Sequence, residues 1–177
     1  MDFEKKKLIF LLKKDKSTKG SIDNDIKYLL EKINSLNDYF TTSSCSGRIV
    51  LLTTQEKKSS KFIFVSHQPC NLPKITQNCW LMVEPIILHV RCRNLNAANI
   101  LLDLVLRAGL GKSGLISLDG LLLEINSTER IVNYLTPNLN QEYITELNEI
   151  ANNKLKKMKE KIFVLIKSIE FSNQDSC

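Results

Sequence analysis

Apolar residues recur at helical spacing in several parts of the chain. Residues 3–14 predict a short basic helix, and a second helix follows Asp23, which we expect to be its N-cap. The apolar stripe of the second helix consists of Ile26, Leu29, Leu30, Ile33 and Leu36. A third helix over residues 95–108, capped by Asn94, is apolar nearly all round, so we expect it to be buried.

A long helix is predicted near the end of the sequence, over residues 141–169. At 1.5 Å per residue it would be roughly 45 Å long. Its buried stripe is expected to consist of Tyr143, Leu147, Ile150, Leu155, Met158, Ile162 and Leu165.

Shorter apolar runs between turn residues predict strands. Two of them, residues 114–118 and 121–125, flank Asp119-Gly120, which is the strongest hairpin signal in the chain. The other predicted strands are residues 49–52, 62–66, 79–83 and 86–93. Together these elements indicate an α+β fold, with a mixed, largely antiparallel sheet and flanking helices.

The order of elements also suggests an internal duplication. Ser46-Gly47-Arg48-Ile49 and Ser113-Gly114-Leu115-Ile116 both follow a helix and begin a strand, although four letters are too few to prove a repeat. We therefore expect one α+β domain over residues 1–177, with half-repeats at 15–75 and 80–135 and a groove between them.

Composition is that of an ordinary globular protein, with 43% hydrophobic and 25% charged residues. A net charge of +6 favours polyanionic partners, although the lysine runs at 5–7 and 154–161 can equally be solvated helix faces. Five cysteines without CxxC spacing and only two histidines favour neither a disulfide framework nor a metal site. This cysteine usage favours a reducing, cytoplasmic compartment, and we expect no membrane partner because no apolar run reaches the length of a membrane span.

The segment Gly109–Gly114, "GLGKSG", matches two nucleotide-binding patterns in letters only. A dinucleotide fingerprint follows a strand and opens a helix, whereas here a helix comes first and a strand follows. A phosphate loop needs a glycine five positions before Gly111, where this chain has Leu106. We therefore reject both motifs.

Alternation in the strand at residues 86–93 separates apolar from polar residues. His89, Arg91 and Arg93 share one face, and such a row can hold a carboxylate or a phosphate, or can simply be solvated. His67 ends another strand before a proline-containing loop, where sites often form, although a strand-end histidine is more often structural.

The stretch "DYFTTSSCSGRIVLL", residues 38–52, places six small polar residues before a strand. We interpret it as a turn from helix into strand in which Gly47 lets the backbone approach a ligand and Arg48 contacts an anion. Cys45 resembles a nucleophile, but no histidine lies near it in sequence, which favours a small hydrophobic role.

These residues, taken together, resemble a known family. "DYFTTSSCSGRI" is similar to the signature of the tRNA wybutosine-synthesizing protein 3 family. Further segments agree in the same order and cover nearly the whole chain: "DKSTKGSID", "FVSH", "EPIILHVRCR", "KSGLI" and "EYITELNEIANNKLKKMKEKI".

The resemblance implies an S-adenosylmethionine-dependent methyltransferase whose fold is not the doubly wound sheet of most methyltransferases. Its substrate would be phenylalanine tRNA carrying a wyosine-type precursor, methylated at the N-4 position of the tricyclic base 3′ to the anticodon. Other enzymes of wybutosine biosynthesis are further candidate partners.

The resemblance also implies site residues. The cofactor-binding set is Ser44, Cys45, Ser46, Gly47, Arg48, Ser113 and Gly114. The substrate-binding set is Lys19, Arg91 and Arg93. Our hypothesis is that His67 or His89 accepts the proton lost from the methylated nitrogen, since a neutral imidazole titrates near the working pH. No metal is needed for this reaction.

The chain departs from the family pattern at three positions. Met82 and Asn126 stand where a lysine and an arginine are common, and Asn133 stands where a proline is common. Two alternatives remain open at this point: a tRNA-binding module without catalysis, and an enzyme of another class that uses Cys45 covalently.

Overall fold

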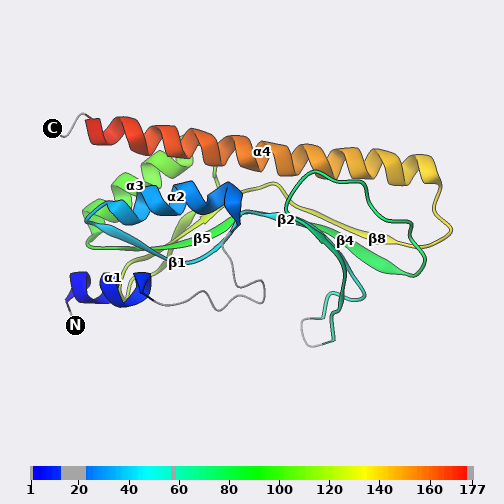
Figure 1. Cartoon of the computed structure of the whole chain (residues 1–177), viewed down its shortest axis with the longest axis horizontal. Coiled ribbons are helices and arrows are strands. Elements are labelled where there is room, and N and C mark those ends of the chain that lie inside the picture. Colours follow the sequence, from blue (N-terminus) through cyan, green and yellow to red (C-terminus); the bar gives the residue numbers. More distant parts are fainter. Residues whose placement is uncertain (1, 13–22, 57–58, 175–177) are drawn as a thin grey trace. The chain divides into compact units, whose positions relative to one another are not determined.

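The computed structural model describes residues 2–12, 23–56 and 59–174, and the described strands form two sheets (Figure 1). The helices are α1 (Phe3–Leu11), α2 (Asn24–Ser35), α3 (Leu95–Arg107) and α4 (Gln141–Gln174). The strands are β1 (Tyr39–Cys45), β2 (Arg48–Leu52), β3 (Phe62–Ser66), β4 (Cys79–Glu84), β5 (Ile87–Cys92), β6 (Gly114–Ser117), β7 (Leu122–Asn126) and β8 (Ile131–Leu135).

All described strand pairs are antiparallel, which confirms the predicted α+β class and excludes a doubly wound parallel sheet for the part of the chain described. Sheet A has the strand order β1-β5-β7-β6, and sheet B has the order β3-β2-β4-β8. No described helix is both long and apolar enough to cross a membrane.

The chain divides into two compact units, each with its own sheet. Unit 1 comprises residues 1–46, 86–128 and 159–177, and contains sheet A. Unit 2 comprises residues 47–85 and 129–158, and contains sheet B. The duplication expected over residues 15–75 and 80–135 stays a prediction.

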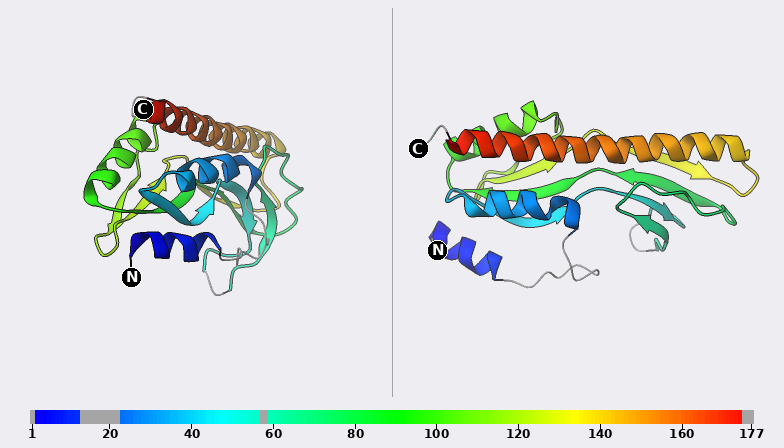
Figure 2. Two further views of the ribbon diagram at one scale, coloured as in Figure 1. Left: turned by 60° about the vertical axis from the view of Figure 1, so that its left-hand side comes forward. Right: turned by 45° about the horizontal axis from the view of Figure 1, so that its top comes forward.

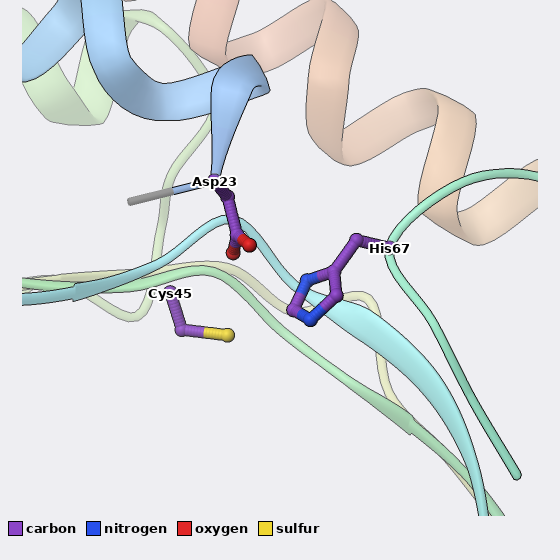
Figure 3. A group of neighbouring side chains, drawn as sticks. All are labelled: Asp23, Cys45 and His67. Carbon is purple, nitrogen blue, oxygen red and sulfur yellow. The ribbon is translucent and has the colours of Figure 1, made fainter. Parts of the chain in front are cut away.

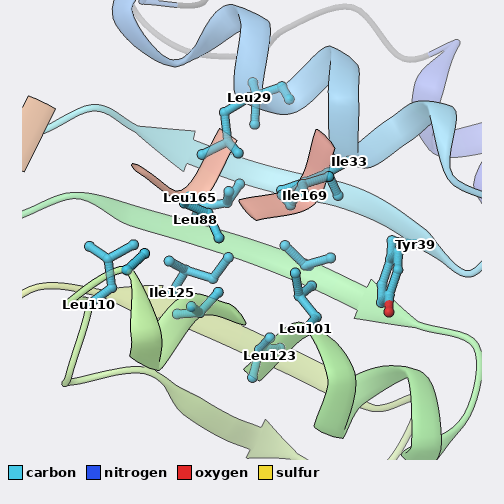
Figure 4. Packing of buried hydrophobic residues seen from close by; sticks show 14 of the residues in the cluster. Leu29, Ile33, Tyr39, Leu88, Leu101, Leu110, Leu123, Ile125, Leu165 and Ile169 are labelled. Carbon is cyan, nitrogen blue, oxygen red and sulfur yellow. The ribbon is translucent and has the colours of Figure 1, made fainter. Parts of the chain in front are cut away.

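The core of unit 1 lies on one face of sheet A (Figure 4). Leu88 from β5 and Ile125 from β7 are fully buried there, together with Leu29 and Ile33 of α2 and Leu101 of α3. Each such side chain contributes roughly 1.5–3 kcal/mol through burial. The opposite face of sheet A carries α1, as Figure 2 shows, and the rings of Phe3 and Phe10 pack on Phe40 with centroids 5.3 Å apart.

The core of unit 2 lies on one face of sheet B. Ile49, Leu51, Leu81 and Val83 alternate with outward-facing residues along β2 and β4. They pack against the first part of α4, where the buried stripe consists of Ile144, Leu147, Ala151, Leu155 and Met158.

Most of the predicted helix signals are confirmed. Four of the five residues of the predicted α2 stripe are buried, while Leu36 follows the helix as its C-cap and is partly buried. The Asn94 side chain caps α3 by accepting a hydrogen bond from the Ala97 N–H at 2.8 Å. The predicted hairpin forms from β6 and β7, with Gly120 at φ +74° in its turn. The first helix ends at Leu11, and the end of the predicted range, from residue 13, lies outside the described residues.

Three expectations on burial are wrong, one for α3 as a whole and two for residues of α4. Ile100 and Leu106 of α3 are 50% and 46% exposed, so this helix buries one face only and is not surrounded by core. Tyr143 and Ile150 of α4 are 41% and 44% exposed, because the helix turns them away from sheet B while Ile144, Leu147 and Ala151 face it.

The turn predicted over residues 41–46 is also wrong, because this segment is mostly β-strand. β1 pairs with β5 from Tyr39 to Cys45, with a bulge between Thr41 and Ser43. The backbone of β1 pairs with β5, which is far along the chain. The side chains of residues 41–46 show no alternation of apolar and polar residues from which a strand could be predicted. β8 was missed as well, and it is an edge strand beside β4.

Gly47 directly follows the six small polar residues and has a backbone φ that residues other than glycine avoid. Its φ is +90°, and a Cβ built there would lie 3.1 Å from the Glu84 carbonyl oxygen and 3.0 Å from Met158 Sδ. The close neighbours of Gly47 are therefore within its own unit.

We expect Gly47→Ala to lower the free energy of unfolding by about 1–3 kcal/mol, because alanine is strained at this φ and the Glu84 backbone cannot yield. Urea unfolding followed by circular dichroism measures the effect. Gly111→Ala is the matched control, since nothing lies within 4 Å of its added Cβ. Equal stability of the two variants would contradict this account of Gly47.

Candidate functional site

Strand order gathers several of the predicted site residues at one end of sheet A. Cys45 in β1 lies opposite Ile87 in β5, which in turn lies opposite Asn126 in β7. Gly114 begins β6 beside β7 and pairs with Glu124. The serine-cysteine stretch, residues 41–46, and the Ser113-Gly114 pair are thus at the same end of one sheet, in unit 1.

Ser46 is held at this end by a contact with Asp23, the residue that directly precedes α2. Its side chain is fully buried, and both its N–H and its hydroxyl donate to Asp23 Oδ2, at 3.3 Å and 3.1 Å. Asp23 precedes α2 but does not cap it with its side chain. Figure 3 shows Asp23 and Cys45, and an Asp23 carboxylate oxygen lies within 4.8 Å of Cys45 Sγ.

A chain of hydrogen bonds crosses three strands on the outer face of sheet A, the face opposite the core. Ser43 Oγ lies 2.7 Å from His89 Nδ1, and His89 Nε2 lies 3.0 Å from Glu124 Oε2. Asn126 Nδ2 donates to the other oxygen of Glu124 at 3.1 Å. Both ring nitrogens of His89 are therefore engaged, by side chains from the strands on either side of β5.

The charge of Glu124 fixes the tautomer of neutral His89. The Asn126 and His89 hydrogen bonds lower the pKa of Glu124, so its carboxylate stays ionised in the neutral range and can only accept. Nε2 must then carry the proton and donate to Glu124, which leaves the lone pair of Nδ1 facing Ser43. Ser43 is exposed, so this basic nitrogen lies at an accessible part of the outer face.

Two polar atoms at the same end of sheet A have no hydrogen-bond partner in the part of the chain that the structure describes. Asn126 Oδ1 and Ser127 Oγ are buried without a hydrogen bond to any described residue. Buried polar atoms of this kind are usually satisfied by a ligand or by water. Ser113 lies beside them, since its hydroxyl accepts from the Asn126 N–H at 2.9 Å. A ligand with hydroxyl or ammonium donors would match the two acceptors.

The predicted arginines of β5 are engaged in contacts within unit 1. Arg91 Nη1 donates to the Asp119 carbonyl at 2.7 Å, in the β6–β7 turn. Arg93 donates to Asp38 Oδ1 at 2.6 Å and also pairs with Glu4 of α1. Their roles toward a substrate stay predictions, and so does that of Lys19, which lies outside the described residues.

Three other predicted site residues belong to unit 2. Gly47 lies before β2, and Arg48 donates from Nε to Glu84 Oε2 at 2.5 Å. Arg48 thus binds a carboxylate of the protein itself, that of Glu84. His67 follows β3 in the loop that leads to β4, and Figure 3 labels it as well. Of the two histidines, only His89 shares a unit with the serine-cysteine stretch.

Sequence reasoning missed Ser43, Glu124 and Asn126 as partners of His89. Alternation within residues 121–125 was the available signal, since it places Glu124 on the face opposite Leu123 and Ile125. It could not show that Glu124 lies opposite His89, because that depends on the pairing of β5 with β7.

The comparisons with known proteins agree over nearly the whole chain. The model of the family described as Methyltransferase TYW3 matches residues 4–79 and 74–170. A protein of Pyrococcus furiosus named tRNA(Phe) 7-((3-amino-3-carboxypropyl)-4-demethylwyosine(37)-N(4))-methyltransferase 1 is 35% identical over 173 residues, which is 88% of each chain. The tRNA wybutosine-synthesizing protein 3 homolog of Xenopus laevis is 35% identical over 169 residues, covering 85% of this chain and 67% of its own.

A solved structure of the PH1069 protein from Pyrococcus horikoshii is similar in fold, with a TM-score of 0.83 and 33% identity. The match covers 95% of this chain and 96% of that one. Family model, sequence relatives and structure all agree with the resemblance carried by the serine-cysteine stretch, and the chain belongs to the Methyltransferase TYW3 family.

Proposed function

We propose that this protein is an S-adenosylmethionine-dependent tRNA methyltransferase of wybutosine biosynthesis. The reaction is methylation of the N-4 position of the tricyclic guanosine derivative that lies 3′ to the anticodon of phenylalanine tRNA. Support for the substrate comes from the family and from the archaeal relatives, whose names specify this position.

The observation that carries the chemistry is the hydrogen-bonded chain around His89. A nitrogen that gains a methyl group must lose a proton, and a neutral imidazole is suited to accept it near neutral pH. His89 Nδ1 is the basic atom, since Nε2–H is committed to Glu124. The Ser43 hydroxyl at 2.7 Å can donate to Nδ1 and receive the substrate proton in exchange.

Glu124 acts on the reaction through His89 and is a positioning residue. Its carboxylate fixes the ring orientation and stabilises the imidazolium that forms when the proton arrives. Asn126 in turn holds Glu124 through its other oxygen. His89, Glu124 and Asn126 thus already hold one another in place, and substrate binding does not require them to move.

The end of sheet A also fits the methyl donor. S-adenosylmethionine supplies an electrophilic methyl group and carries an ammonium and ribose hydroxyls, which are donors for unpaired acceptors. Asn126 Oδ1 and Ser127 Oγ are such acceptors among the described residues. We assign S-adenosylmethionine to this end of sheet A, beside Ser44, Cys45, Ser46, Ser113 and Gly114.

The compartment that fits this substrate is the cytoplasm. None of the described cysteines, Cys45, Cys70, Cys79 and Cys92, forms a disulfide with another described residue. Burial raises the pKa of Cys92 to about 12 and also raises that of Cys79, which makes both poor nucleophiles.

Deletion of the gene is expected to leave phenylalanine tRNA with a nucleoside one methyl group lighter than the next pathway intermediate. Mass spectrometry of tRNA nucleosides measures this accumulation, and the purified protein with S-adenosylmethionine should convert the accumulated tRNA. Normal wybutosine in the deleted cells would overturn the proposal. Binding of the tRNA without methyl transfer, and without calorimetric binding of S-adenosylmethionine, would instead indicate a non-catalytic module.

Loss of the imidazole in His89→Ala is expected to lower the methylation rate by roughly 10²- to 10⁴-fold, the usual contribution of a positioned base. Glu124→Gln should lower it less, since the imidazole stays in place but loses the carboxylate that orients it and stabilises the imidazolium. Single-turnover rates measured across pH 5–9 test both variants.

Glu170→Gln serves as the control for a lost carboxylate. Glu170 is tied to Tyr28, Lys32 and Lys167 in unit 1, and the Tyr28 hydroxyl and the two lysines lower its pKa to about 2. This variant should keep the wild-type methylation rate. His67→Ala tests the other histidine: if it abolished methylation while His89→Ala did not, the base would be His67.

A further inference from the structure

The outer face of sheet B, opposite the unit 2 core, carries an aromatic row. Phe62 in β3 lies opposite Leu52 in β2, which lies opposite Trp80 in β4, which lies opposite Tyr134 in β8. One cross-strand row of side chains therefore spans all four strands. At 4.7–4.9 Å between strands, it runs for roughly 14 Å.

The ends of the row are exposed although they are large and aromatic. Phe62 is 56% exposed and Tyr134 is 46% exposed, and their neighbours in the next row, Val65 and Val132, are 40% and 46% exposed. Between these residues Leu52 is 7% exposed and Val50 is fully buried, so the exposed apolar side chains lie on the edge strands β3 and β8, and exposed apolar clusters of this kind usually mark a binding surface. The Trp80 and Tyr134 rings pack against each other with centroids 5.0 Å apart, which fixes their orientation.

Positive charge borders this row of aromatic residues. Arg130 precedes β8, is exposed, and alternates with Val132 and Tyr134, which puts it on the same face. Arg48 places its guanidinium over the Phe62 ring, 5.1 Å from the centroid. Of its guanidinium nitrogens, Nε alone donates to a described residue, which is Glu84.

We infer that this face of sheet B binds unpaired nucleotides of the substrate RNA. Bases stack on exposed aromatic rings of a four-stranded antiparallel sheet, and neighbouring cations contact the phosphates. The combination of aromatic rings in one row with Arg48 and Arg130 at its borders matches that chemistry better than it matches an apolar protein partner. The inference rests on the proposed function for the identity of the RNA.

The test is the affinity for phenylalanine tRNA isolated from cells that lack this protein. Tyr134→Leu, which keeps an apolar side chain but loses the aromatic ring, is expected to weaken binding roughly 5- to 150-fold, the range for loss of one stacked base. Tyr134→Phe should bind like the wild type. Fluorescence anisotropy at one fixed salt concentration measures all three proteins.

Phe163→Ala is the matched control, because Phe163 is an exposed aromatic residue of α4 in unit 1, at 60% exposure. It should bind RNA normally. Arg130→Ala should weaken binding of all RNA sequences alike and reduce the dependence of log affinity on log salt by about one.

Wild-type affinity in Tyr134→Leu, or no binding of the tRNA by the wild type, would overturn the inference. A wild-type dimer that dissociates in Tyr134→Leu, seen by size-exclusion chromatography with light scattering, would assign the face to a second copy of the chain instead. Because the readout is binding alone, it is separate from the proposed function: RNA binding that needs Tyr134 but brings no methyl transfer would uphold the inference and refute the catalytic proposal.

Discussion

Pairing of β5 on both of its edges is the constraint on which unit 1 depends. Strand β1 occupies one edge and β7 the other, so the register of β5 sets both faces of sheet A. On one face Leu88 and Val90 enter the core, and on the other His89 meets Ser43 and Glu124. A one-residue slip would exchange the two faces and destroy core and hydrogen-bonded chain together.

The fold was predictable where a local signal and the packed structure agree. The apolar stripe of α2, the cap of α3 by Asn94 and the turn at Gly120 all depend on neighbours within a few positions, and all are present. The alternation in β5 likewise separated its apolar from its polar residues correctly. β1 was not predictable from pattern, because its strand conformation comes from pairing with β5 rather than from its own small polar side chains.

The candidate site was predictable only in part, for the same reason. His89 and the serine-cysteine stretch could be selected from the sequence, but the partners of His89 are defined by the register between strands. Glu124 meets His89 because β7 pairs with β5, and Ser43 meets it because a bulge in β1 shifts the pairing by one residue. Arg48 shows the opposite case, since a contact expected for a ligand is made with Glu84 of the neighbouring strand.

The alternation of segments between the two units bears on how the protein folds. Sheet A needs β1, from before residue 47, and β5, from after residue 85, and the segment between them belongs to unit 2. Pairs so distant in sequence make loop closure costly and folding slow relative to a chain rich in local contacts. During synthesis on the ribosome, β1 must remain without its partner strand until β5 has emerged. Neither unit corresponds to a continuous stretch of sequence, so neither can be excised as a fragment, and the protein has to acquire both sheets as one chain.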